Sequence, residues 1–349
     1  MKICLYTDVH WSVYSSILRQ RDQKYSLRLQ NLIDSVNFVQ RLAENNNCDR
    51  ILCLGDFFDR NTLNAEELDA LKEIKWADIP QYFLVGNHEI VSTSDSYSST
   101  QVFTSMGFEV IGKNSVEVVD DSLLVYLPYS TEENREPISE CVDRMYEYYQ
   151  RHFIPKKKII FSHNDIKGIR YGAFESKEGY SVDEIEADSN LFINGHLHNA
   201  GFVNDNETIL NLGNLSGMNF GEDGFKYDHY ACILDTDTLK LDFFTNPHAI
   251  YFYKLEINSL SDLKVFTKLK NKSIISVRVA EQLVNDVKNA INNSNNIIAS
   301  KITIFTKDKV AKTETSSFNI NYLDKLQDFC LEKIGNYEVL KQELSILCK

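Results

Sequence analysis

The chain has 349 residues, of which 43% are hydrophobic and 25% are charged, proportions that are typical of folded globular proteins. This composition excludes a disordered, collagen-like or coiled-coil chain, and no apolar run approaches the roughly 20 residues that a membrane-spanning helix needs. Acidic residues outnumber basic ones by 50 to 37, so the formal net charge is −13. The chain alone therefore lacks the positive charge for tight nucleic-acid binding, although bound metal ions and a partner subunit could supply it.

The cysteines point to a reducing compartment. There are seven of them, scattered along the chain with no C-x-x-C pair, which speaks against a disulfide framework or a cysteine zinc site. The N-terminus turns acidic too early for a secretory signal. We therefore expect a cytoplasmic protein with no membrane partner.

The first 250 residues or so repeat one pattern, in which a short apolar run ends in glycine, aspartate, asparagine or histidine. Strands are predicted at 3–6, 51–54, 82–85, 159–161 and 191–193, and helices at 29–42, 65–74 and 138–149. Alternating strands and helices predict an α/β fold with much parallel sheet. In such folds the side chains that bind ligands gather beyond the carboxyl ends of the strands.

After residue 208 the strands follow one another closely, at 208–212, 230–234, 240–244 and 250–257, and we expect them to form the second sheet of a two-sheet sandwich. A composition shift near Asn258 precedes a small β-α-β unit, with strands at 273–279 and 299–306 around a helix at 281–291. Residues 313–317 read as a linker. Apolar residues at helical spacing then predict two C-terminal helices, at 322–334 and 337–347.

A cluster that contains aspartate, asparagine or histidine follows each of five predicted strands. The clusters are Asp8-Val9-His10, Gly55-Asp56-Phe57-Phe58-Asp59, Gly86-Asn87-His88-Glu89, Ser162-His163-Asn164 and Gly195-His196-Leu197-His198. Each cluster alone is more often a turn or a cap than a functional site. Five in order are hard to explain that way, because polar groups brought together at strand ends are costly unless they bind something.

These clusters resemble, in order, the D-x-H, G-D-x-x-D, G-N-H-D/E, H and G-H-x-H blocks of the calcineurin-like metallophosphoesterase superfamily. The resemblance implies an α/β fold with a four-layer α-β-β-α sandwich over residues 1–257. It also implies two divalent metal ions, one held by Asp8, His10, Asp56 and His198 and the other by Asp56, Asn87, His163 and His196, so that Asp56 bridges them. Mixed nitrogen and oxygen ligands favour Mn²⁺, with Mg²⁺, Fe²⁺ and Zn²⁺ left open.

The resemblance gives three neighbouring residues other roles. It implies that His88 does not bind metal but faces the scissile phosphate, where it donates a proton to the leaving oxygen or stabilises its charge. Asp59 and Glu89 are expected to orient the ligands or His88. For each of these two carboxylates, a solvated position without such a role is the alternative.

The double histidine of the last cluster, followed by about 100 further residues, resembles the nuclease subunits of recombination-repair complexes. These are the SbcD and Mre-eleven types and their compact phage counterparts. The resemblance implies a Mn²⁺-dependent exo- or endodeoxyribonuclease that acts on DNA in repair, recombination or replication. It would lie in the host cytoplasm if a phage encodes the chain.

The same resemblance implies partners. Residues 258–312 would form a β-α-β capping domain that presents DNA, and residues 313–349 would dock an SMC-like ATPase subunit of the SbcC type. A homodimer is left open. The alternative is a metal-dependent phosphatase, or a phosphodiesterase for cyclic nucleotides or other small molecules, with an accessory domain.

A basic cluster follows the first of the five motifs. Its members are Arg19, Arg21, Lys24 and Arg28. They could contact a phosphate backbone, or they could be the solvated face of a helix. The sequence alone leaves both interpretations open.

Overall fold

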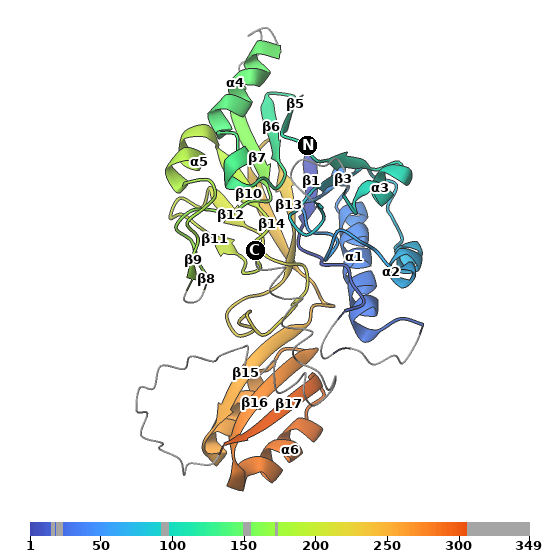
Figure 1. Ribbon diagram of the computed structural model, residues 1–349, viewed down its shortest axis with the longest axis vertical. Coiled ribbons are helices and arrows are strands. Elements are labelled where there is room, and N and C mark those ends of the chain that lie inside the picture. Colours follow the sequence, from blue (N-terminus) through green and yellow to red (C-terminus); the bar gives the residue numbers. More distant parts are fainter. Residues whose placement is uncertain (15–17, 19–23, 92–97, 149–154, 172–173, 306–349) are drawn as a thin grey trace, which may run out of the picture. The chain divides into compact units, whose positions relative to one another are not determined.

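The computed structural model describes residues 1–305 except 15–17, 19–23, 92–97, 149–154 and 172–173 (Figure 1). Met1–Phe305 is one compact unit. The predicted linker and C-terminal helices, at 313–349, lie outside the described residues. Within the described part of the chain, no helix is both long enough and apolar enough to cross a membrane.

The first sheet carries three of the five polar clusters. Its strand order is β14-β13-β1-β2-β3-β4, with bounds β1 Lys2–Tyr6, β2 Arg50–Cys53, β3 Gln81–Leu84, β4 Glu109–Ile111, β13 Tyr230–Asp235 and β14 Lys240–Thr245. Strands β1 to β4 are parallel, whereas β13 runs antiparallel to β1. The carboxyl ends of β1, β2 and β3 therefore meet at one edge.

The second sheet carries the other two clusters. Its order is β11-β12-β10-β7-β6-β5, with bounds β5 Ser115–Val119, β6 Ser122–Leu127, β7 Lys157–Ser162, β10 Leu191–Asn194, β11 Gly201–Phe202 and β12 Ile209–Asn211. Strands β6, β7, β10 and β12 are parallel. A separate two-stranded ribbon is formed by β8 Arg170–Tyr171 and β9 Phe174–Glu175.

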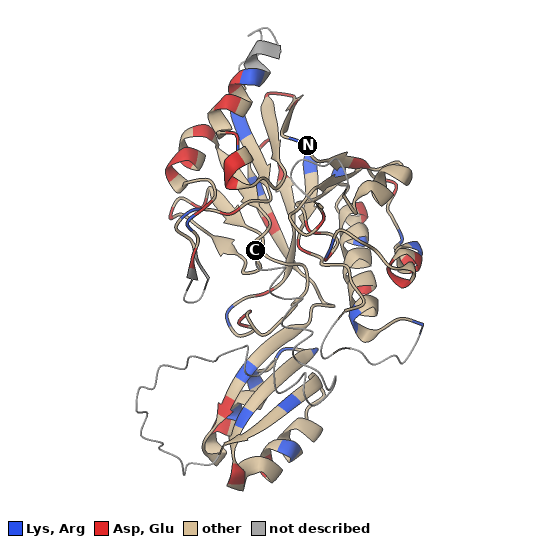
Figure 2. Ribbon diagram, viewed as in Figure 1, with Lys and Arg blue, Asp and Glu red and all other residues tan. Residues whose placement is uncertain are grey.

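Helices cover the outer faces of both sheets. On the first sheet lie α1 Leu27–Asn45, α2 Ala65–Ala70 and α3 Gln101–Ser105, and on the second lie α4 Ile138–Tyr148 and α5 Val182–Asp188 (Figure 1). Acidic residues gather on α4 and α5 (Figure 2), and α5 alone holds four of them among its seven residues. The four-layer α-β-β-α sandwich is confirmed.

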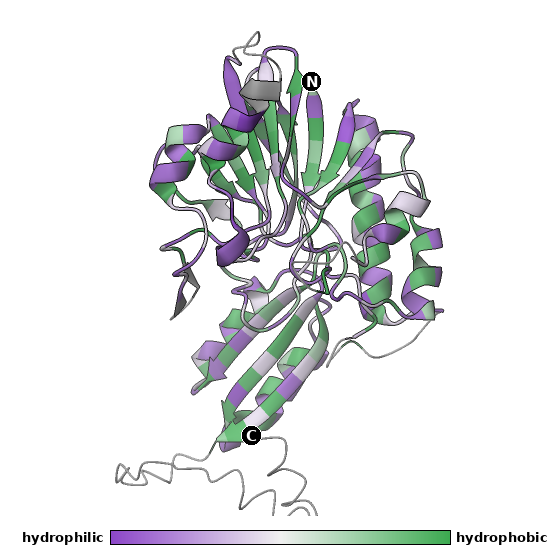
Figure 3. Ribbon diagram, turned by 45° about the horizontal axis from the view of Figure 1, so that its top comes forward, coloured by the Kyte–Doolittle hydropathy of each residue, from purple (hydrophilic) through white to green (hydrophobic). Residues whose placement is uncertain are grey.

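The core lies between the two sheets. Apolar residues concentrate along their strands (Figure 3), and Leu5, Leu52 and Leu84 of the first sheet pack against Ile159 and Ile193 of the second. All five side chains are at most 1% exposed. Because successive strand residues point to opposite faces, the intervening apolar residues pack outward on the helices, which makes these strands apolar throughout.

The third sheet corrects part of the strand assignment. Its strands β15 Tyr251–Ile257, β16 Ser273–Ala280 and β17 Ile297–Phe305 are all parallel, and α6 Val284–Asn292 packs on them. The predicted β-α-β unit is thus present. The prediction that 230–234, 240–244 and 250–257 join the second sheet was wrong, because β13 and β14 extend the first sheet and β15 joins β16. The domain bounds 1–257, 258–312 and 313–349 stay a prediction.

Candidate metal centre

All five polar clusters meet at one edge of the sandwich. Asp8 and His10 follow β1, Asp56 follows β2 and Asn87 follows β3. His163 follows β7, and His196 and His198 follow β10. Three groups of side chains each offer ligand atoms within 4.8 Å of one another: Asp8, His10 and His198; Asp56, His163 and His196; and His10, Asp56 and His88. The structure therefore brings the predicted residues together in space.

In the first group, a carboxylate faces two imidazoles. The Nε2 atoms of His10 and His198 lie only 3.0 Å apart, and Asp8 Oδ1 lies 3.7 Å from the first and 3.9 Å from the second. Thr7 donates a hydrogen bond of 2.6 Å to the other oxygen of Asp8 and so orients it. Asp8 and His10 are almost completely buried.

The second group is built around Asp56. Its Oδ2 lies 3.2 Å from Nε2 of His163, while its Oδ1 accepts a hydrogen bond of 3.0 Å from the backbone N–H of His88. Asn87 places its Oδ1 3.0 Å from Nδ1 of His196. Asp56 thus stands between the two groups, where a shared ligand is expected.

The backbone is strained at four of these residues. Asp8, His10, Asp56 and His196 have φ angles of 50°, 50°, 49° and 69°, in the left-handed region that residues other than glycine rarely adopt. Such conformations cost on the order of 1–3 kcal/mol each and cluster at functional sites. All four strained residues belong to the polar clusters that meet at this edge of the sandwich.

A family model described as "Calcineurin-like phosphoesterase" matches residues 1–200, which is more than half of the chain. The chain belongs to this family. A protein of Invertebrate iridescent virus 3 named "Putative phosphoesterase 078R" is 24% identical over an aligned length of 184 residues, and the match covers 49% of this chain and 49% of that protein. The chain thus spans about half the length of this curated relative.

Solved structures with similar coordinates include three phosphoesterases. An archaeal phosphodiesterase has a TM-score of 0.36 at 14% identity, covering 70% of this chain and 99% of its own. A dimetal phosphatase from Danio rerio scores 0.39 at 12%, covering 66% and 91%. A purple acid phosphatase from yellow lupin scores 0.44 at 12%, covering 72% and 52%.

Members of this family use a two-metal site. In this chain, the second nitrogen of each histidine ligand candidate lies near an oxygen atom of a neighbouring residue. The partner atoms are Asp59 Oδ1 at 3.3 Å from His10 Nδ1, the Leu54 carbonyl at 2.6 Å from His163 Nδ1, Asp165 Oδ2 at 3.4 Å from His196 Nε2 and Glu222 Oε1 at 3.3 Å from His198 Nδ1. Metal-binding histidines are oriented in this way, by an acceptor on the outer nitrogen.

The inward-facing atoms complete the fit. Asp8 Oδ1 and His163 Nε2 are buried and have no hydrogen-bond partner within the described part of the chain, a costly state that a cation relieves. Burial disfavours the charged form of His10, yet the nearby carboxylates of Asp59 and Asp8 raise its pKa to about 10. Burial likewise opposes the charge of His163, and Asp56 raises its pKa to about 9. The site attracts positive charge. The residues fit two divalent ions, although the division of ligands between them stays a prediction.

His88 differs from the other histidines of the site. Its side chain is exposed, and its Nδ1 lies 2.9 Å from the carbonyl oxygen of Asp59. Its ring meets that of His10 edge to face, with centroids 4.8 Å apart. The imidazole of His88 is thus accessible from solvent beside buried ligand candidates, and the role predicted for it stays a prediction.

Asp59 and Glu89 both support other site residues. Asp59 contacts His10 through its carboxylate and His88 through its carbonyl. Glu89 is fully buried and accepts hydrogen bonds of 3.0 Å from the N–H of Phe58 and 2.8 Å from that of Gly86. Burial, with the nearby charge of Asp56, raises the pKa of Glu89 to about 7. Glu89 therefore ties the second cluster to the third.

Sequence reasoning missed two carboxylates of the site. Asp165 and Glu222 hold His196 and His198, and Glu222 also accepts hydrogen bonds from Met218 N–H and from the Asn214 amide. Burial opposes the charge of Glu222, but His198 lowers its pKa. Asp165 could have been predicted from the sequence because it stands two residues after His163. Glu222 could not, because it lies in a loop without a motif.

Close packing of Gly86 against Asp56 leads to a prediction. A Cβ at Gly86 would lie 2.1 Å from Asp56 Oδ1 and 2.5 Å from Asp56 N. We expect Gly86→Ala to displace the carboxylate and to cut metal content and hydrolysis by more than the ~10–100-fold that loss of an orienting residue costs. Metal analysis of the purified variant checks this. Gly201→Ala, whose Cβ would meet nothing within 4 Å, is the control, and a Gly86→Ala protein that keeps both ions would contradict the packing argument.

Proposed function

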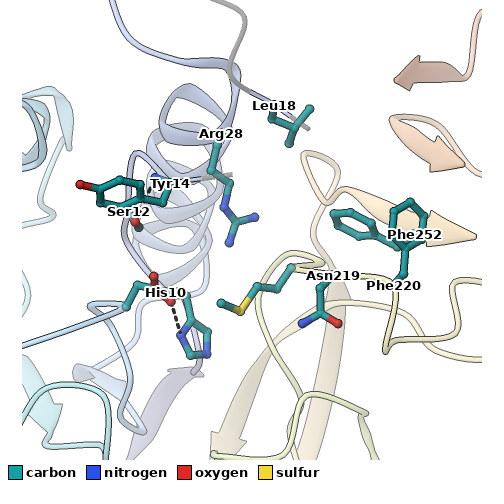
Figure 4. Close-up of a pocket in the computed structure, with 10 residues that line it drawn as sticks. His10, Ser12, Tyr14, Leu18, Arg28, Asn219, Phe220 and Phe252 are labelled. Carbon is teal, nitrogen blue, oxygen red and sulfur yellow. Dashed lines mark hydrogen bonds and ion pairs between the residues drawn. The ribbon is translucent and has the colours of Figure 1, made fainter. Parts of the chain in front are cut away.

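We propose that this protein is a metal-dependent phosphodiesterase that hydrolyses DNA. The observation that carries the proposal is a cavity of about 190 Å³ that opens directly beside His10 and Asp59 (Figure 4). Its far wall is formed by Phe220 and by Phe252 of β15. A phosphodiester carries a group on each side of its phosphorus, and this cavity offers space for the second group, with aromatic side chains of the kind on which bases stack.

The chemistry follows from the residues at the centre. Bound divalent ions polarise phosphoryl oxygens and lower the pKa of water, so that a nucleophile is available near neutral pH. His88, held by the carbonyl of Asp59, gives a proton to the leaving oxygen. The mixture of imidazole, carboxylate and amide donors suits Mn²⁺.

The charge distribution restricts where a strand can approach. The outer helices α4 and α5 are acidic (Figure 2), and the whole chain carries a net charge of −13. A nucleic-acid backbone is repelled by such surfaces. The proposed path of the strand therefore crosses the metal centre and the adjoining cavity, where bound ions reverse the local charge.

Three substrates tested side by side check the proposal. Full-length protein with Mn²⁺ is incubated with linear duplex DNA, with single-stranded DNA and with bis(p-nitrophenyl) phosphate, each with and without a chelator. We expect Mn²⁺-dependent cleavage of at least one DNA substrate. Cleavage of the small diester with both DNAs intact would contradict the proposal and support the alternative of a small-molecule phosphodiesterase.

We further propose that the C-terminal segment binds an SMC-like ATPase subunit. The support is in the sequence, where Tyr322, Leu326 and Phe329 are spaced as the apolar anchors of a helix that lies in a partner's groove. Deleting residues 318–349 should leave metal content and Mn²⁺-dependent cleavage intact while abolishing association with the ATPase, measured by co-purification. Loss of the metals on deletion would mean that the segment belongs to the core of the enzyme.

A further inference from the structure

Arg28 is a buried cation that has no carboxylate partner among the residues that the structure describes. It is the second residue of α1, and only 4% of it is exposed. One guanidinium nitrogen donates a hydrogen bond of 2.9 Å to the carbonyl of Gly217, and no carboxylate of the described residues lies within ion-pair distance. Burying a charge in this way is costly unless something pairs with it.

The guanidinium points into the cavity beside the metal centre. Figure 4 shows Arg28 reaching from α1 into the space between His10 on one side and Phe220 and Phe252 on the other. The two carboxylates that act on Arg28 at longer range, Asp59 and Glu222, are each held by a histidine of the site. Arg28 thus brings into the cavity a positive charge with which no carboxylate of the described residues forms an ion pair.

Two roles are consistent with a buried arginine. It could be a structural tie between α1 and the loop that carries Glu222, for which the single hydrogen bond to Gly217 suffices. A guanidinium, however, has five N–H donors in a planar fork that matches a phosphate, and the bond to Gly217 uses one. If Arg28 binds a phosphate, this role explains both the N–H donors that Gly217 does not use and the cavity into which the guanidinium points.

The other members of the basic cluster do not share this position. Lys24 is exposed and forms an ion pair of 2.6 Å with Asp69, so it corresponds to the solvated alternative. Arg19 and Arg21 lie outside the described residues. Arg28 therefore differs from Lys24 because it is buried and because it lines the cavity.

We infer that Arg28 binds a phosphate of the substrate that neighbours the one being cleaved. The inference rests on the proposed function and narrows it: the scissile phosphate would lie at the metal ligands, whereas Arg28 lines the cavity that adjoins them. The substrate class is then a nucleic-acid strand with at least two consecutive phosphates. A charge-assisted, bidentate contact of this kind increases binding by about 10–100-fold.

Small thymidine oligonucleotides test the inference without assuming a cleavage polarity. TpTpT has a second phosphate beside whichever linkage is cut, whereas TpT has none, and TpTpT with one methylphosphonate linkage keeps the length but loses the second charge. We expect kcat/KM of the unaltered protein to be about 10–100-fold higher for TpTpT than for the other two. Arg28→Met should abolish this preference, mainly through KM, and change TpT hydrolysis less than about threefold. Arg28→Lys should restore part of it.

Controls separate the possible outcomes. Arg41→Met removes the same side chain from an exposed position of α1 and should leave every substrate unaffected, and metal content should be unchanged in all variants. If Arg28→Met slows TpT and TpTpT equally, or loses metal, Arg28 is only structural and the inference is wrong. If the unaltered protein cleaves both without preference, the inference is also wrong, while the proposed function stands. If it cleaves no DNA of any length, both are wrong.

Discussion

Asp56→Asn should remove both metal ions and reduce hydrolysis below detection if, as predicted, this carboxylate is the ligand that both ions share. Its Oδ2 faces His163 at 3.2 Å, and its Oδ1 is fixed by the backbone of His88 at 3.0 Å. Asparagine keeps the size but removes the negative charge that offsets two neighbouring cations. The loss should therefore exceed the ~10–100-fold that replacing a residue behind the ligands costs.

Metal analysis of purified variants measures this effect. His198→Ala should weaken mainly one site, since His198 is close to Asp8 and His10 but is not among the ligand candidates around Asp56. Asp242→Asn, which removes an exposed carboxylate paired with Lys240, is the matched control and should bind metal normally. Two ions still bound to Asp56→Asn would show that this residue is not the shared ligand.

His88→Gln should separate chemistry from binding. His88 is the exposed histidine of the centre, and its Nδ1 is held 2.9 Å from the carbonyl of Asp59. If it protonates the leaving oxygen, the variant should keep both metals and its DNA affinity while turnover falls by about 10²–10⁴-fold, the usual contribution of a positioned acid. Glutamine retains hydrogen-bonding capacity but has no imidazole nitrogen that could donate a proton to the leaving oxygen.

The choice of leaving group sharpens this test. Nitrophenolate leaves without needing a proton, so His88→Gln should hydrolyse bis(p-nitrophenyl) phosphate with a smaller loss than it shows on DNA. An equal loss on both substrates would point to stabilisation of charge rather than proton donation. Loss of metal from the variant would mean that His88 is a ligand, and its assignment would be wrong.

The ligand candidates could be predicted from the sequence because each directly follows an apolar strand. In a parallel sheet such positions converge at one edge, so Asp8, Asp56 and His163 meet without any knowledge of the loops. The residues behind them could not be found in this way. Glu222 reaches His198 from a loop, and Arg28 contacts Gly217 across 189 positions of the chain.

The strand partners of the C-terminal half show a second limit. The apolar run of β13 is compatible with either sheet. In the structure β13 pairs with the edge of β1 that β2 leaves free, with Lys2 opposite Asp235. Similarly, β15 was grouped with the preceding strands because it is close to them in sequence, yet it pairs along its length with β16. Alternation and length predict a strand but contain no information on its neighbour.

Titration of the metal-free, full-length protein with Mn²⁺ tests the two-metal centre most directly. Bound metal and hydrolysis of bis(p-nitrophenyl) phosphate are followed in the same samples. We predict two ions per chain at saturation, with hydrolysis that rises only as the second site fills. Saturation at a single ion per chain, or hydrolysis that persists when no ion is bound, would contradict this account.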